Sequence, residues 1–262
     1  MIAAATRYER ASDVDHALEL LGEPDAKAIA GGQSLIPVMK LRIARPSLVV
    51  DISRLELRGV EGRDGALHIG PLTTWADLAV ADPPSGLEAI PECAREIGDV
   101  QVRNLGTVGG SIVHADPASD MPAVLLALGA SVEVRSTDGS RSVPLAGFLV
   151  GPFTTALGGQ ELVTDIVVPL PASGSASAYA SVEHPASGFA LVGAAALVGP
   201  AGETVAVTGV AATPFVLVGD PQEAIERAEI FGDRFASEEY RRDLAFVVAE
   251  RALTSARARS AA

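Results

Sequence analysis

Two glycine pairs are the segments of this 262-residue chain whose residue types most favour ligand chemistry. One pair lies in AGGQS at residues 30–34, and the other lies in GTVGGS at residues 106–111. Glycine allows backbone N–H groups to approach a phosphate closely, a following helix N-terminus adds positive potential, and Ser or Thr hydroxyls can complete the shell. Two such anion-binding segments would suit a diphosphate. Either Gly-Gly pair taken alone is more often an ordinary tight turn.

The residues around the first pair predict a small βαβ unit that would hold the pair between a strand and a helix. We expect a strand at 27–30, a turn at the two glycines, a helix at 35–43 and a second strand at 47–52. A further helix is predicted at 13–21, because Ser12 can cap its start and apolar residues follow at helical spacing.

The second pair lies within a longer stretch of alternating elements. Beyond the βαβ unit we expect strands at 66–70, 131–135, 141–145 and 162–168 and helices at 74–79, 87–97 and 123–128. The composition changes at 172–178, a stretch rich in Gly, Ser and Ala, and we place a domain boundary there. After it we expect a hairpin of strands at 191–198 and 204–210, then helices at 221–230 and 237–256.

Composition excludes several classes of site. The one cysteine, Cys93, permits no internal disulfide and cannot hold an iron–sulfur cluster, which needs about four thiolates. The four histidines show no metal-ligand spacing, so no metal site is expected. The net charge of −13 repels phosphate backbones, so nucleic-acid binding is not expected. No run approaches the roughly 18 apolar residues of a membrane span, and the N-terminal charge order reverses that of a secretory signal, so we expect a cytoplasmic protein.

The common dinucleotide and nucleotide motifs are missing from the chain. No G-x-G-x-x-G follows a predicted strand, and no G-x-x-x-x-G-K-[ST] occurs. Rossmann and P-loop binding are therefore both disfavoured. A flavin dinucleotide held by another glycine-rich arrangement remains compatible with the residues present.

Two long segments resemble the FAD-binding subunits of molybdenum hydroxylases. They are AGGQSLIPVMKLRIARPSLVVDI at 30–52 and QVRNLGTVGGSIVHADPASDMPAVLLALGA at 101–130. The similarity is greatest to the medium subunits of aerobic carbon monoxide dehydrogenase-like enzymes, and the flavin segment of xanthine dehydrogenase is a more distant relative. It continues in GPFTTAL at 151–157, ELVTDIVVP at 161–169, HPASGFALVGAAA at 184–196 and EYRRDLAFVVAERAL at 239–253, so it covers nearly the whole chain.

The resemblance implies an α+β fold with two domains. Residues 1–172 would form an FAD-binding domain of the PCMH type, which is vanillyl-alcohol-oxidase-like, with subdomains at about 1–57 and 58–172. Residues 177–262 would form a C-terminal sheet-and-helix domain of the carbon monoxide dehydrogenase flavoprotein type. FAD would lie between the two subdomains of the first domain.

The resemblance also implies which residues bind FAD, without a covalent bond. These are Ala30, Gly31, Gly32, Gln33, Ser34, Leu35, Thr107, Val108, Gly109, Gly110, Ser111, Asp120 and Val163. The two glycine segments would wrap the diphosphate and the adjoining part of the cofactor, Asp120 would accept hydrogen bonds from it, and Val163 would lie near the flavin. Asp120 as a plain helix cap and Val163 as ordinary strand core are open alternatives. No catalytic acid or base is implied.

One departure from the family concerns charge near the flavin. Many relatives carry a lysine shortly beyond the aromatic residue that is Tyr179 here, whereas this chain has Ala180 and Ser181. A cation at that place would favour an anionic reduced flavin. Without that cation, NAD, a quinone and oxygen are all open alternatives as the electron acceptor of the flavin.

The implied function is electron relay within a heteromer. A large partner subunit would bind molybdopterin and hydroxylate the substrate, and a small partner would carry the [2Fe–2S] clusters, in a dimer of heterotrimers. This chain would pass electrons from those clusters to an external acceptor. Two alternatives are a free-standing flavin oxidase of the vanillyl-alcohol-oxidase type, which usually has a much larger substrate domain, and a non-catalytic assembly protein that keeps the fold without cofactor.

Overall fold

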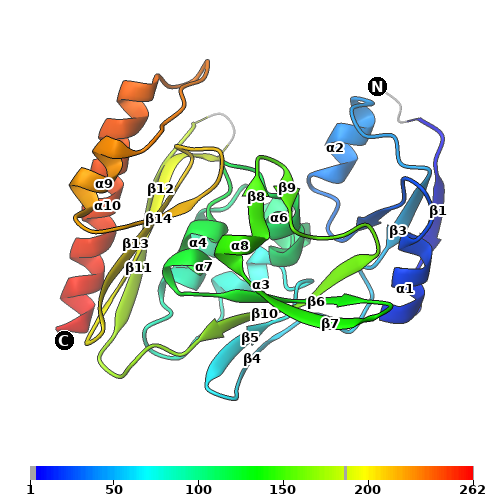
Figure 1. Ribbon diagram of the computed structural model, residues 1–262, viewed down its shortest axis with the longest axis horizontal. Coiled ribbons are helices and arrows are strands. Elements are labelled where there is room, and N and C mark those ends of the chain that lie inside the picture. The colour runs from blue at the N-terminus through cyan, green and yellow to red at the C-terminus, as the bar shows by residue number, and fades with distance from the viewer. Residues whose placement is uncertain (1–3, 186–187, 262) are drawn as a thin grey trace.

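The computed structural model describes residues 4–185 and 188–261. Residues 1–3 of the first predicted subdomain, residues 186–187 in the motif at 184–196, and Ala262 of the predicted C-terminal domain lie outside this range. The described chain forms three parts side by side, from the N-terminal unit at the right of Figure 1 to the long C-terminal helix at the left. Helices and strands occur in each part, so the predicted α+β class is confirmed.

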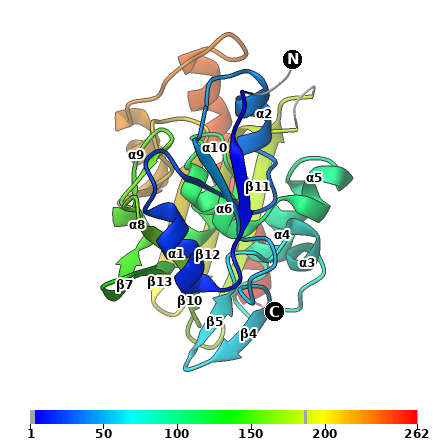
Figure 2. The same cartoon turned by 90° about the vertical axis from the view of Figure 1, so that its right-hand side faces the viewer.

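The N-terminal unit is a three-stranded parallel sheet in the order β1–β3–β2. Its strands are β1 (Arg7–Arg10), β2 (Lys27–Ile29) and β3 (Leu48–Asp51). Helix α1 (Val14–Leu21) precedes β2, and α2 (Leu35–Lys40) connects β2 to β3. Figure 2 shows this unit from its outer side, with α2 above and α1 below. Because β2 and β3 pair in parallel across α2, the predicted βαβ unit is confirmed.

Details of this unit differ from the prediction. The carboxylate of Asp13, rather than Ser12, caps α1 by accepting the N–H of His16. Helix α2 ends before the predicted residue 43, because Arg42 has a left-handed φ of 58° and the chain turns there. Strand β1 is an addition, since its sequence RYER lacks the apolar alternation that predicts a strand.

The middle part is a five-stranded antiparallel sheet in the order β4–β5–β10–β6–β7. Its strands are β4 (Val60–Arg63), β5 (Ala66–Ile69), β6 (Ser131–Ser136), β7 (Gly139–Pro144) and β10 (Glu161–Pro169), with a separate short hairpin of β8 (Leu149–Gly151) and β9 (Thr154–Thr155). Its helices are α3 (Trp75–Ala79), α4 (Ala89–Glu96), α5 (Val100–Leu105), α6 (Val108–His114), α7 (Met121–Ala127) and α8 (Leu145–Phe148).

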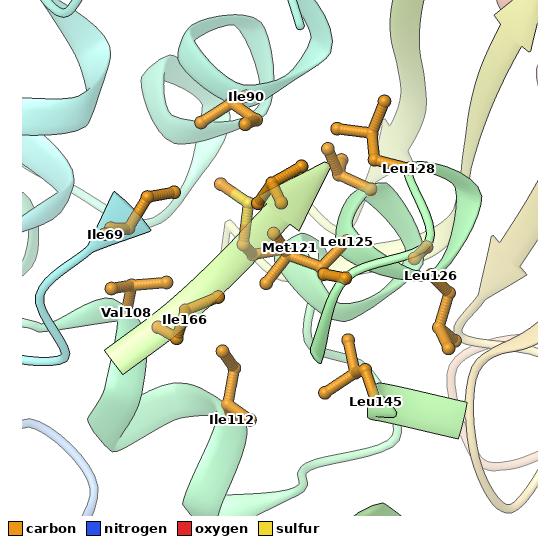
Figure 3. Close-up of a cluster of buried hydrophobic side chains, with 14 of the residues drawn as sticks. Ile69, Ile90, Val108, Ile112, Met121, Leu125, Leu126, Leu128, Leu145 and Ile166 are labelled. Atoms are coloured by element: carbon orange, nitrogen blue, oxygen red, sulfur yellow. The ribbon is translucent and has the colours of Figure 1, made fainter. Parts of the chain in front are cut away.

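Helix α6 begins at the second glycine pair and is not among the predicted helices, because glycine is a poor helix former. It forms because the hydroxyl of Thr107 caps its first turn and because Val108 and Ile112 are fully buried in the core of the middle part. Figure 3 shows these two side chains with Met121 of α7 and Ile166 of β10 in that core. Core packing therefore outweighs the low helix propensity of the glycines.

The C-terminal part is a four-stranded antiparallel sheet in the order β11–β12–β13–β14. Its elements are β11 (Ala176–Glu183), β12 (Ala190–Gly199), β13 (Gly202–Thr208), β14 (Phe215–Leu217), α9 (Pro221–Arg227) and α10 (Glu238–Ser260). Helix α10 covers one face of this sheet (Figure 1), and α7 of the middle part packs on the other. Within residues 4–185 and 188–261, no helix is long and apolar enough to span a membrane.

Strand β11 begins inside the stretch at 172–178 where the sequence predicts a domain boundary. Its small residues are typical of a linker, but they form a strand because Ala178 and Ala180 pack in the core beneath α10. The opposite face of the same strand presents Tyr179 to the middle part. The division at this point therefore stays a proposal, and the two parts it separates share a packed contact.

Candidate functional site

The first glycine segment presents a row of backbone donors. Residues 31–35 follow β2 and lead into α2, and all five are half-buried. Within the described part of the chain, none of their N–H groups donates to an acceptor, and the first helical N–H to do so is that of Ile36, to the carbonyl of Gly32. Successive unpaired N–H groups in a turn form a concave site for an anion. This segment therefore has the backbone state that the sequence predicts.

The second glycine segment has the opposite backbone state. The N–H of Val108 donates to Thr73 O at 3.0 Å, and that of Gly109 donates to Pro71 O at 2.9 Å. The next two N–H groups donate to Thr107, one to Oγ1 at 3.2 Å and one to the carbonyl at 3.1 Å. The four N–H groups of residues 108–111 are thus engaged within the protein and do not form a row of free donors. That this segment contacts the cofactor stays a prediction. Gly110, which is exposed, offers the surface for such a contact.

The two segments lie against each other. A Cβ added to Gly31 would lie 1.8 Å from Leu105 O and 3.0 Å from the Cα of Gly106, so only glycine allows this close approach. A Cβ on Gly110 would be 4.0 Å from the Cβ of Ala30, which places the exposed surface of the second segment beside the start of the first. The structure therefore brings together both predicted segments, although they are more than 70 residues apart in sequence.

Asp120 is not the helix cap that one sequence interpretation allows. It stands before α7, but its side chain makes no cap hydrogen bond. Instead its Oδ1 accepts a hydrogen bond of 2.5 Å from the hydroxyl of Tyr179. Burial raises the pKa of Asp120 to about 7, although the Tyr179 hydrogen bond lowers it, and the charges of Glu183 and Glu96 raise it further. Burial and the nearby Asp120 charge also raise the pKa of Tyr179 well above its ordinary value.

Val163 lies in β10, is only 4 % exposed, and belongs to the core of the middle part. Its position is that of ordinary strand core, as the alternative interpretation requires. Proximity to the flavin remains a prediction for this residue.

Three residues that the sequence interpretation omits also hold the site. Ser119 is buried and its hydroxyl lies 2.7 Å from that of Ser111, which follows the second glycine pair. The carbonyls of Thr73 and Pro71 accept hydrogen bonds from N–H groups of the second segment. A signal for the latter pair exists in the sequence, because Thr74 and Asp77 form a capping box that places the loop before α3.

Ala180 and Ser181 line a pocket of about 580 Å³ between α4, β11 and α10. Its lining residues are Glu92, Arg95, Glu96, Tyr179, Ala180, Ser181, Glu183, Ser255 and Arg259. Burial and a hydrogen bond to Glu96 raise the pKa of Glu183. The positive charge at this pocket comes from arginines on the two helices and not from β11.

Comparison with known proteins agrees with the fold and the glycine segments. The family described as the FAD binding domain in molybdopterin dehydrogenase matches residues 4–171. The glyceraldehyde dehydrogenase medium chain of Sulfolobus acidocaldarius is 44% identical over 191 residues, which cover 72% of this chain and 68% of the relative. The carbon monoxide dehydrogenase medium chain of Afipia carboxidovorans is 33% identical and covers 99% of both chains.

A solved structure extends the likeness to the whole fold. Carbon monoxide dehydrogenase from Hydrogenophaga pseudoflava, in a form that lacks the Mo-pyranopterin moiety, matches with a TM-score of 0.92 and 34% identity over 99% of each chain. The predicted fold, an FAD-binding domain followed by a sheet-and-helix part, is confirmed by this match, and so is the assignment to the oxidoreductases. The chain therefore belongs to the FAD-binding medium subunits of the molybdenum hydroxylase family.

Proposed function

We propose that this chain relays electrons within a cytoplasmic molybdenum hydroxylase. It would take electrons from the [2Fe–2S] clusters of a small partner subunit and deliver them to an external acceptor, while a large molybdopterin subunit hydroxylates the substrate. When bound, FAD supplies the chemistry of accepting electrons singly and passing on two together. The single observation that carries the proposal is the row of five N–H groups at residues 31–35 that have no acceptor in the described part of a chain of this family.

The residues present fit a bound dinucleotide. The N–H groups of residues 31–35 would hold the diphosphate, because hydrogen bonds from neutral donors to a charged acceptor are strong and need no cationic side chain. Gly31 keeps this row against the second segment, where Gly110 offers a surface without a side chain. Ala30, Gln33 and the hydroxyl of Ser111 would complete the contacts around the diphosphate.

The chain's own side chains orient the cofactor and need not transfer protons in this proposal. Asp120 would accept a hydrogen bond from the cofactor with the carboxylate oxygen that Tyr179 does not occupy. The remaining proposed contacts come from Gly32, Ser34, Leu35, Thr107, Val108, Gly109 and Val163.

Burial of the cysteine argues against a covalent flavin bond through Cys93. Cys93 is fully buried in the core of the middle part, and burial raises the pKa of its thiol well above the ordinary value. A buried, protonated thiol does not provide the reactive thiolate that a covalent flavin bond would need.

The testing experiment is the visible spectrum of the protein copurified with its partners, followed by acid precipitation. We expect flavin and iron–sulfur absorbance before precipitation, FAD in the supernatant afterwards, and a native mass equal to two heterotrimers. Flavin that stays with the precipitate, in a preparation without iron, would instead identify the free-standing oxidase. A preparation without any flavin would identify an assembly protein.

A further inference from the structure

Two side chains of the C-terminal sheet hold two consecutive residues next to the second glycine segment. The hydroxyl of Thr208, at the end of β13, lies 2.7 Å from the carbonyl of Ser119 and 3.0 Å from that of Pro117. The hydroxyl of Tyr179, on β11, donates to Asp120 at 2.5 Å. Thr208 is fully buried, and Ser119 and Asp120 are each less than 10 % exposed. These contacts cross the predicted domain boundary.

A backbone hydrogen bond extends the same contact to the long helix. The N–H of Gly209 donates to Pro117 O at 3.0 Å. Gly209 has a φ of 79°, and a Cβ there would lie 2.5 Å from Leu191 O, so the position requires glycine. Arg241 of α10 donates to the carbonyls of both Gly209 and Leu191, at 2.5 Å each. The loop of the middle part is thereby tied to the buried side of α10.

The held residues lead directly to the second glycine segment. The hydroxyl of Ser119 lies 2.7 Å from that of Ser111 in α6. A shift of the loop at 117–120 would therefore move both Ser111 and Asp120, which are two of the predicted cofactor contacts. The loop lies between α6 and α7 and belongs to neither helix. Asp116 closes its turn by accepting the N–H groups of Ala118 and Ser119, each at 2.9 Å, and Thr208 ties this turn to the C-terminal sheet.

Packing alone does not explain a threonine at this position. Thr208 follows Ala206 on the face of β13 that meets the middle part, where a valine would have nearly the same shape but no hydroxyl. A valine would leave the Ser119 carbonyl without its buried donor, and an unpaired buried polar group is costly. Gly193 leaves the space that the Tyr179 side chain needs, because a Cβ at Gly193 would lie 2.3 Å from the Tyr179 hydroxyl.

We propose that the C-terminal part is a positioning element of the FAD site, with Thr208 and Tyr179 as positioning residues. The inference rests on the proposed function, because it assumes that FAD binds at the glycine segments. The hydroxyl of Thr208 holds the loop at 117–120 in place, and the hydrogen bond between Ser119 and Ser111 couples the position of this loop to that of Ser111. The hydroxyl of Tyr179 orients the carboxyl group of Asp120.

The test titrates the full chain with FAD and follows the quenching of flavin fluorescence. Thr208→Val should weaken FAD binding by about tenfold, the effect of leaving one buried acceptor unpaired. Thr208→Ser restores the hydroxyl and should bind FAD like the wild type. Thr204→Val is the matched control, because Thr204 lies on the same face of β13 and makes no side-chain hydrogen bond within the described part of the chain.

A second measurement separates positioning from general stability. In the chain without FAD, hydrogen exchange of the peptide that covers 115–120 should be faster in Thr208→Val than in Thr204→Val. If Thr208→Val does not fold, Tyr179→Phe takes its place, with exposed Tyr240→Phe as the control and the same two readouts.

The possible outcomes distinguish this inference from the proposed function. If the wild type binds FAD and Thr208→Val binds it as tightly as Thr204→Val does, the inference is overturned and the proposed function stands. Faster exchange at 115–120 without loss of FAD affinity also overturns it. A wild-type chain that binds no FAD, even when copurified with its partners, overturns both.

Discussion

The two glycine segments share similar residues, but their backbones are in opposite states. Among residues 4–185 and 188–261, no acceptor pairs with the N–H groups of residues 31–35, whereas those of residues 108–111 all donate within the protein. The difference lies in what surrounds each pair. The second segment packs against the loop at 71–73, whose carbonyls accept two of its N–H groups, while the first packs against Leu105 and Gly106 without donating an N–H group to them. A Gly-Gly pair is therefore available to an anion only where no neighbouring carbonyl accepts its N–H groups.

The largest expected effect follows from Gly31→Ala. The new Cβ would meet Leu105 O and push the two segments apart, so FAD affinity should fall by about a hundredfold, as expected for a steric conflict with backbone. Flavin fluorescence titration measures this. Gly147→Ala is the control, since nothing lies within 4 Å of a Cβ there. Wild-type affinity in the Gly31 variant would show that the segments need not touch.

The same substitution in the second segment should act on stability. In Gly109→Ala the Cβ would lie 2.3 Å from the Cβ of Pro71, so we expect the free energy of unfolding to fall by ~1–3 kcal/mol. Urea denaturation of the chain without FAD measures this loss. An unchanged unfolding midpoint would contradict the close packing of the second glycine segment against Pro71.

Asp120, beyond the second segment, should make stability depend on pH. Its folded pKa of about 7 lies above the unfolded value, so the folded chain keeps a proton that the unfolded chain releases. Its contribution is therefore favourable in acid and is lost as the pH rises from about 4 to 7, by at most ~1.4 kcal/mol per pH unit. Asp120→Asn should remove this slope in urea denaturation across that range. An identical slope in the variant would contradict the raised pKa.

The smallest expected effect concerns the side chain inside the first segment. Gln33 donates to Gly31 O at 3.3 Å, a long and partly exposed hydrogen bond. Gln33→Ala should weaken FAD binding by about threefold, in line with one modest hydrogen bond. Gln222→Ala, at an exposed position of α9, serves as the control. A loss comparable to that of Gly31→Ala would mean that side chains, rather than backbone N–H groups, dominate binding.

Sequence patterns predict the elements whose signals are local. The βαβ unit around residues 27–52 is correct, because its strands are apolar and the glycine turn between them is short. Helix α6 escapes prediction because its glycines have low helix propensity, and its cap and buried face outweigh that deficit. Strand β11 escapes prediction because Ser and Ala residues resemble a linker until α10 packs on them.

The sequence indicates which segments form the candidate site, but it does not indicate which hydrogen bonds their residues make. The two glycine segments were expected at one site, and Gly31 and Leu105 do meet. No local pattern indicates that Pro71 O accepts from Gly109, or that the hydroxyl of Tyr179 donates to Asp120 across 59 residues. Such partners are decided by tertiary packing, so the sequence alone cannot distinguish a free N–H group from a satisfied one.

Hydrogen exchange with and without FAD tests the role of the first segment most directly. In the chain without FAD, the amides of residues 31–35 should exchange fast and those of residues 108–111 slowly, because only the latter have acceptors. Adding FAD should slow exchange at residues 31–35 and leave residues 108–111 nearly unchanged. Protection that appears at residues 108–111 instead, with residues 31–35 still exchanging fast, would contradict the assignment of the first segment as the diphosphate site.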